Sequence, residues 1–193
     1  MIKKKFNDWF DISTLKEPFR VEGKKTLGYE IAEQLGWRFP DVVVYETGGG
    51  TGLIGMWKAF VEIKSMGWVN DPLPRMVAAQ STGCAPVVKA FQERQRDTDF
   101  WENSDTVALG LNVPGPLGGA WILNILRESK GIAIMIDEQR LKALTEEFNN
   151  LTSINSSDEG GVGWGAYSHL KKVGWIKPKE RSVIFATGIE RIK

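Results

Sequence analysis

The sequence predicts an α/β fold, in which a mostly parallel sheet lies between two layers of helices as a three-layer sandwich. The first observation is that short apolar runs alternate with segments of helical periodicity along the chain. The second is that these runs are rich in β-branched residues, as strands buried on both faces are. The third is a glycine-rich loop, residues 47–52, between one such run and a helical segment. We expect residues 1–193 to form a single α/β domain.

The apolar runs mark the expected strands. The clearest is residues 42–45, Val-Val-Val-Tyr, because its β-branched residues follow Pro40 and Asp41 directly. The expected strands are residues 42–45, 76–79, 132–136 and 182–186, with a further short strand at 107–111.

Helical periodicity marks the segments between the strands. Leu27, Ile31 and Leu35 recur every four residues before Gly36, which predicts one helix over residues 24–35. Asp137 is expected to cap the helix that follows the third strand. The expected helices are residues 24–35, 53–65, 86–91, 120–129, 140–148 and 162–172.

The composition excludes several classes of protein. The net charge is +1, which gives no field to attract nucleic acid or an anionic membrane. The single cysteine, Cys84, excludes an internal disulfide framework and a cysteine metal cluster. No apolar stretch is long enough to span a membrane, and the first residues lack the apolar region of a signal peptide. We therefore expect a cytoplasmic protein without a metal site.

The loop after residues 42–45 is the main candidate for a binding site. Gly48, Gly49, Gly50, Thr51 and Gly52 lie between a strand and a helix, where glycines let backbone amides approach an anion. The start of a helix adds unpaired amide donors and the positive end of its dipole. This arrangement predicts a ligand that carries a phosphate.

Three interpretations of the loop compete. A nucleotide P-loop needs Lys and then Ser or Thr after its last glycine, but Met56 follows Gly55. A dinucleotide-binding loop fits Gly50, Gly52 and Gly55, but the next strand ends in Gln80 without the expected carboxylate. The third interpretation is a phosphate monoester such as pyridoxal phosphate, held by consecutive amides.

The chain resembles the threonine synthases in a series of ordered motifs. Residues 47–60, TGGGTGLIGMWKAF, resemble their phosphate loop and the helix after it, and residues 13–26, STLKEPFRVEGKKT, resemble the segment before it. The other matching segments are residues 83–86, 89–91, 101–103, 113–118, 127–129 and 187–188.

This resemblance implies the large domain of a fold type II pyridoxal-phosphate enzyme. Gly48, Gly49, Gly50, Thr51 and Gly52 would then bind the phosphate of pyridoxal 5′-phosphate. Thr187 stands where the family places a hydroxyl against the pyridine nitrogen. The implied reaction converts a small phosphorylated amino acid, O-phosphohomoserine, and water to threonine and phosphate.

The family's Schiff-base lysine is missing from these motifs. It lies in a Ser-Phe-Lys-x-Arg-like segment upstream of the others, and no lysine of this chain has that setting. The chain is therefore expected to correspond to the C-terminal half of the enzyme, to contain no catalytic residue and to be inactive alone. A separate N-terminal half or a second copy is the expected partner.

Two other functions compete with this interpretation. The first is a non-catalytic module that binds a phosphate metabolite, and the second, which fits the residues less well, is an NAD(P)-binding domain.

Other conspicuous residues have structural explanations. Cys84 is expected to be a small packed residue and His169 a surface or half-buried side chain that binds no ligand. Gly118 and Gly119 fit either a second anion site or a structural turn. Ile189 and Glu190 depart from the family's Asn-Thr-Gly-Ser-Gly pattern around Thr187.

Overall fold

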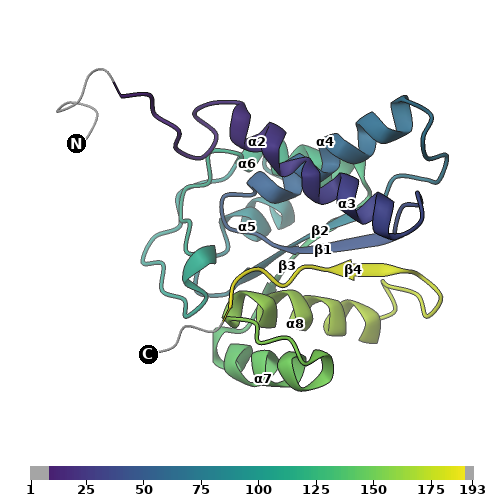
Figure 1. Ribbon diagram of the computed structural model, residues 1–193. Coiled ribbons are helices and arrows are strands. Elements are labelled where there is room, and N and C mark those ends of the chain that lie inside the picture. Colours follow the sequence, from purple (N-terminus) through teal and green to yellow (C-terminus); the bar gives the residue numbers. More distant parts are fainter. Residues whose placement is uncertain (1–8, 190–193) are drawn as a thin grey trace.

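A parallel sheet forms the middle layer of the molecule (Figure 1). The computed structural model describes residues 9–189. Within that range the sheet has four strands in the order β3-β2-β1-β4, and every neighbouring pair is parallel. The strands are β1 (Val42–Glu46), β2 (Arg75–Ser81), β3 (Ile132–Ile136) and β4 (Ser182–Ile184). The predicted α/β fold with a parallel sheet is confirmed.

Helices cover both faces of this sheet (Figure 1). One face carries α2 (Phe19–Lys24), α3 (Thr26–Gln34), α4 (Thr51–Ser65), α5 (Pro86–Gln92) and α6 (Gly119–Glu128). The other face carries α7 (Leu141–Thr152) and α8 (Asp158–Lys172). Two short 3-10 turns, η1 (Leu109–Leu111) and η2 (Glu138–Arg140), complete the described elements. No helix in residues 9–189 combines the length and the apolar character that crossing a membrane requires.

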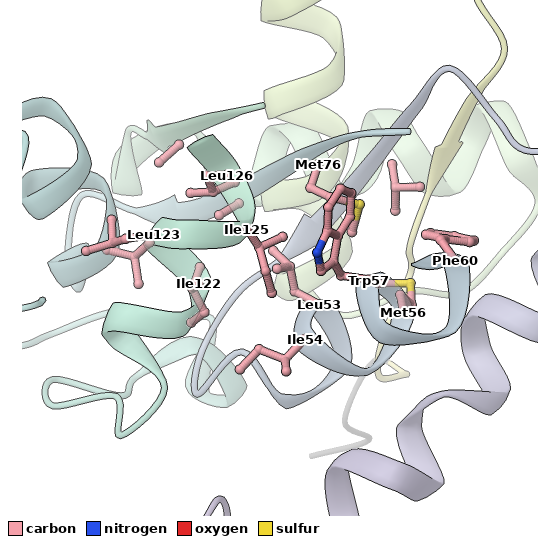
Figure 2. Packing of buried hydrophobic residues seen from close by; sticks show 14 of the residues in the cluster. Leu53, Ile54, Met56, Trp57, Phe60, Met76, Ile122, Leu123, Ile125 and Leu126 are labelled. Carbon is pink, nitrogen blue, oxygen red and sulfur yellow. The ribbon is translucent and has the colours of Figure 1, made fainter. Parts of the chain in front are cut away.

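Successive residues of the central strands enter opposite cores. Val43 of β1 belongs to the larger cluster, under α2 to α6, whereas Val42 and Val44 belong to the cluster under α7 and α8. Figure 2 shows the larger cluster, where side chains of α4 and α6 meet Met76 of β2. Both faces of β1 are therefore covered by helices, which explains why polar and apolar residues do not alternate along it.

The order of the strands reverses at β1. β2 follows β1 in the chain and pairs with one side of it, whereas β4 returns across the sheet to pair with the other side. The loops that leave β1 and β4 therefore diverge from the same edge of the sheet. In open parallel sheets this reversal opens a crevice at the carboxyl ends of the two strands.

Two predicted elements differ in the structure. Residues 107–111 were expected to be a strand, and that prediction is wrong, because residues 109–111 form the turn η1. The backbone bonds to itself there, from Leu109 N to Val107 O and from Leu111 N to Ala108 O. The helix expected over residues 24–35 is present as α3, whereas α2, which ends at Lys24 just before it, was not expected.

Helix α8 begins at Asp158, before the predicted residue 162. The sequence pattern missed its first turn because that turn is rich in glycine, which has a low helix propensity. These glycines allow close packing against the neighbouring elements. A Cβ at Gly161 would lie 3.0 Å from Leu141 O of α7, and one at Gly163 would lie 3.2 Å from Phe185 O. The packing of α8 against β4 and α7 therefore requires glycine where the pattern of the sequence disfavours a helix.

Truncating a core side chain of α4 is expected to destabilise the fold. Phe60 is fully buried in the cluster of Figure 2, so Phe60→Ala should lower the free energy of unfolding by about 3–5 kcal/mol. The neighbouring Val61 is 41% exposed, so Val61→Ala should cost less than about 1 kcal/mol. Chemical denaturation of both variants checks the prediction, and equal losses would contradict it.

Candidate functional site

A cavity of about 720 Å³ lies at the carboxyl ends of β1 and β4. The loop after β1 and the segment after β4 line it, together with part of η1 and the segment that leads into α2. This is the crevice that the reversal of strand order at β1 predicts. The structure brings Gly48, Gly49, Gly50, Thr51, Gly52 and Thr187 together around this one cavity.

The backbone of the loop requires its glycines. Gly50 has a φ of 77°, in the left-handed region, and a Cβ there would overlap the side chain of Ile122. A Cβ at Gly48 would lie 2.6 Å from the carbonyl oxygen of Gly110. The loop is thus held against η1 and α6 with bare backbone toward the cavity.

The loop leads directly into the start of α4. Gly50 is the N-cap residue and offers no side chain to the first turn, and the first backbone bond of the helix runs from Ile54 N to Gly50 O at 3.0 Å. The amides of residues 51–53 precede that bond and have no acceptor within the helix. Because α4 is 15 residues long, its dipole adds to the attraction for an anion at this end.

Thr187 is fixed through its backbone. Its amide donates to Glu46 Oε1 at 2.7 Å, and its carbonyl accepts from Ser157 Oγ at 3.2 Å. Ser157 also hydrogen-bonds Glu159, whose Oε1 accepts from the amide of Gly110 at 2.6 Å. The segment after β4 is therefore tied to β1, α8 and η1 at the edge of the cavity.

Glu46 is a site residue that the sequence analysis missed. It is the last residue of β1 and only 2% exposed, and it lines the cavity. Burial raises the pKa of its carboxyl to about 7, and hydrogen bonding to the side chain of Thr187 and to the backbone of Glu46 and Thr187 opposes that rise. Its position at the end of an apolar strand, just before the glycine loop, was the only available signal.

The side of the cavity formed by the N-terminal segment is basic. Lys16, Arg20 and Lys24 are among its lining residues. Lys16 forms an exposed ion pair with Asp11 at 3.2 Å, and Arg20 donates to Ile12 O at 3.4 Å. The cavity thus has cationic side chains on one side and backbone amides on another.

The remaining candidates lie outside this chemistry. Cys84 is buried and burial raises the pKa of its thiol, as a packed structural residue requires, and His169 is exposed. At Gly118 the structure favours a structural turn. A Cβ there would lie 2.7 Å from the side chain of Leu15, so close packing accounts for the glycine. Ile189 lines the cavity and is 69% exposed, whereas Glu190 lies outside the described residues. Residues 9–189 contain no cluster of side chains suited to a metal ion.

Gln80 has a structural role at the end of β2. Its Nε2 donates to Thr47 O at 3.0 Å, and its Oε1 accepts from the amides of Val87 and Val88 at the start of α5. This buried side chain joins the strand, the glycine loop and a helix. It occupies the region where a dinucleotide site would need a carboxylate.

Comparison with known proteins identifies the family. Residues 1–188 match the family model described as "Pyridoxal-phosphate dependent enzyme". The chain belongs to this family. The cofactor of the family is pyridoxal phosphate, the ligand of the third interpretation.

The curated relatives of this pyridoxal-phosphate family member include threonine synthases. The protein of Methanosarcina acetivorans is 31% identical over 171 residues, which are 89% of this chain and 42% of that protein. The protein of Methanocaldococcus jannaschii is 29% identical over the same shares of the two chains. The resemblance to threonine synthases is therefore confirmed, and the chain spans less than half the length of these relatives.

Solved structures share the fold at lower identity. The processed form of threonine deaminase isoform 2 from Solanum lycopersicum has a TM-score of 0.77 and 20% identity, over 98% of this chain and 51% of that one. Maize serine racemase has a TM-score of 0.70 and 18% identity, over 90% of this chain and 50% of that one. The fold is that of the type II pyridoxal-phosphate enzymes.

The residues of the cavity fit a phosphorylated cofactor. The loop from Gly48 to Gly52 presents its backbone to the cavity at the amino end of a long helix. Side chains at Gly48 or Gly50 would collide with neighbouring residues. The half-buried Thr187 stands on the same cavity. The cavity volume of about 720 Å³ is in the range of small-molecule sites.

The buried carboxyl of Glu46 is expected to make stability depend on pH. Its folded pKa of about 7 exceeds the ordinary value of 4.5, so the stability it contributes is complete below pH 4.5 and is lost as pH rises through 7. Between pH 5 and 8, wild type should lose roughly 2–3 kcal/mol of unfolding free energy relative to Glu46→Gln.

The measurement is urea denaturation across this pH range. Glu30→Gln, which removes an exposed carboxylate from α3, is the matched control and should follow the wild type. If the free energy of unfolding changes with pH in the same way for wild type and Glu46→Gln, the prediction is contradicted.

Proposed function

We propose that this chain is the cofactor-binding part of a threonine synthase-like lyase, which converts O-phosphohomoserine and water to threonine and phosphate. The observation that carries the proposal is the convergence of the glycine loop, Thr187 and a basic segment on one cavity. The threonine synthases among its relatives support the choice of substrate class.

The cofactor would be held through its phosphate. The amides of residues 48–52 and the hydroxyl of Thr51 would bind that group, and Thr187 would place its hydroxyl beside the ring nitrogen. When bound, pyridoxal phosphate supplies an electron sink for carbanions at the substrate carbons. A neutral hydroxyl at the ring nitrogen accepts or donates a hydrogen bond without fixing a positive charge there.

The basic side of the cavity would bind the substrate. Lys16, Arg20 and Lys24 supply positive charge for a second anionic group, and a phosphorylated amino acid has a phosphate and a carboxylate to offer. Backbone amides from one segment and cationic side chains from another, in one cavity, suit the pairing of a phosphorylated cofactor with a phosphorylated substrate.

The rest of the enzyme would come from a separate polypeptide or from further residues of the same protein. The chain spans 42% of the M. acetivorans threonine synthase and contains no lysine in the family's Ser-Phe-Lys-x-Arg-like setting. Leu117 and Ile189 line the cavity yet are 68% and 69% exposed, as expected of side chains that another part covers. The missing lysine also favours the alternative of a non-catalytic module that binds a phosphate metabolite.

The chain alone is expected to form no threonine. Without the family's lysine it lacks the group that moves protons between substrate carbons. The assay supplies O-phosphohomoserine and pyridoxal phosphate and measures threonine, first alone and then with a polypeptide from the same genome that carries the lysine segment. Restored turnover supports a split enzyme, whereas threonine formed by the chain alone would contradict the assignment.

Thr51→Ala is expected to weaken phosphate binding about tenfold, because it removes one hydrogen bond to a charged group. The probe is pyridoxine 5′-phosphate, which has no aldehyde and cannot react with lysines. Calorimetry measures its dissociation constant, with Thr152→Ala on α7 as the control outside the cavity. Equal affinities for wild type and Thr51→Ala would show that the hydroxyl does not hold the phosphate.

A further inference from the structure

Glu46 is a buried carboxyl at the cavity that the proposed function does not use. Oε1 accepts from the amide of Thr187 at 2.7 Å, whereas Oε2 is buried and has no hydrogen-bond partner among residues 9–189. Oε2 faces α8, where it would lie 3.4 Å from a Cβ built at Gly163. An ionised carboxyl with one unpaired buried oxygen is costly, so the site favours the neutral acid.

The surroundings of Glu46 do not neutralise it. From α8 the facing titratable group is Glu159, whose negative charge also favours the neutral form, and on the same strand it is the phenol of Tyr45. The neighbouring position on β2 is Ala79, and the segment after β4 contributes the uncharged Thr187. The cations of the cavity, Lys16, Arg20 and Lys24, come from the N-terminal segment, and none of them is hydrogen-bonded or ion-paired to this carboxyl.

A charge on Glu46 would oppose the binding of a phosphate. The residue directly precedes Thr47 and the glycine loop, so its carboxyl and the phosphate cradle belong to one continuous stretch of backbone. Like charges in a site shielded from water repel more strongly than they do in bulk water. Binding a phosphate and ionising Glu46 are thus competing events.

We propose that Glu46 is a positioning residue that must be protonated when a phosphate ligand occupies the cavity, with its Oε1 holding Thr187 in place. This rests on the proposed role of the glycine loop as a phosphate cradle. The chain then takes up a proton as it binds the ligand, and its affinity falls as pH rises through neutrality.

The size of the effect follows from the population of the neutral acid. With a pKa of about 7, Glu46 is protonated in about nine tenths of molecules at pH 6 and about one tenth at pH 8. If only the protonated form binds, the apparent dissociation constant rises about tenfold over this interval. This rise of the dissociation constant with pH is absent when residue 46 cannot ionise.

The experiment measures the dissociation constant of pyridoxine 5′-phosphate at pH 6, 7 and 8 by calorimetry. Because the ligand's own phosphate titrates near pH 6, the readout is the ratio of wild type to variant at each pH. Glu46→Gln keeps an acceptor for the Thr187 amide but cannot ionise. The ratio of the wild-type dissociation constant to that of Glu46→Gln should therefore be about ten times larger at pH 8 than at pH 6. Glu30→Gln, on α3 and outside the cavity, is the control and should keep the wild-type profile.

Glu46→Leu separates charge from positioning, because it removes the acceptor as well. It should bind more weakly than Glu46→Gln at every pH, and both variants should take up fewer protons on binding than wild type does at pH 8. If the leucine variant fails to fold, the glutamine profile still decides.

The outcomes are distinct. Binding by wild type with the same pH profile as Glu46→Gln overturns the proposal for Glu46 and leaves the proposed cofactor cradle intact. No binding by wild type at any pH overturns the cradle, and the proposal for Glu46 with it.

Discussion

The position of β1 between β2 and β4 determines where this molecule can bind a ligand. Parallel pairing on both sides buries both faces of the strand and sends the chain away in opposite directions at its carboxyl end. The glycine loop leaves β1 into α4 on one face, while the segment after β4 turns toward α8 on the other. The position of the crevice is thus a consequence of the strand order, and the surrounding side chains line it.

Close backbone packing connects this crevice to the helix on the far face. The glycine face of α8 lets the chain after β4 approach, with the carbonyl of Phe185 near Gly163, and that approach brings Thr187 within reach of Glu46. On the other side, the carbonyl of Gly110 fills the space that a side chain at Gly48 would need. The glycines of α8 and of the loop after β1 therefore share one function, which is to let backbone segments meet around the cavity.

Local sequence patterns were sufficient for the framework but not for the charges of the site. Strands buried on both faces and the strand-loop-helix order of the glycine loop are visible in any short window. Glu46 was missed because its importance comes from Thr187, which is 141 positions away in the chain. The strand expected at residues 107–111 is instead the turn η1, whose local backbone bonds are joined by a long-range one from the amide of Gly110 to Glu159 of α8. Long-range hydrogen bonds carry what the local pattern lacks.

The charges around the cavity come from several segments of the chain. Backbone amides at the start of α4 and the cations Lys16, Arg20 and Lys24 approach it from different segments, so two anionic groups need not share one set of donors. Glu46 ends β1 and Glu159 lies in the first turn of α8, and their carboxyl oxygens accept hydrogen bonds from the amides of Thr187 and Gly110. If Glu46 stays neutral, Glu159 is the remaining carboxylate among the residues that line the cavity. The buried carboxyl therefore couples the ionisation of the framework to occupation of the crevice that the topology provides.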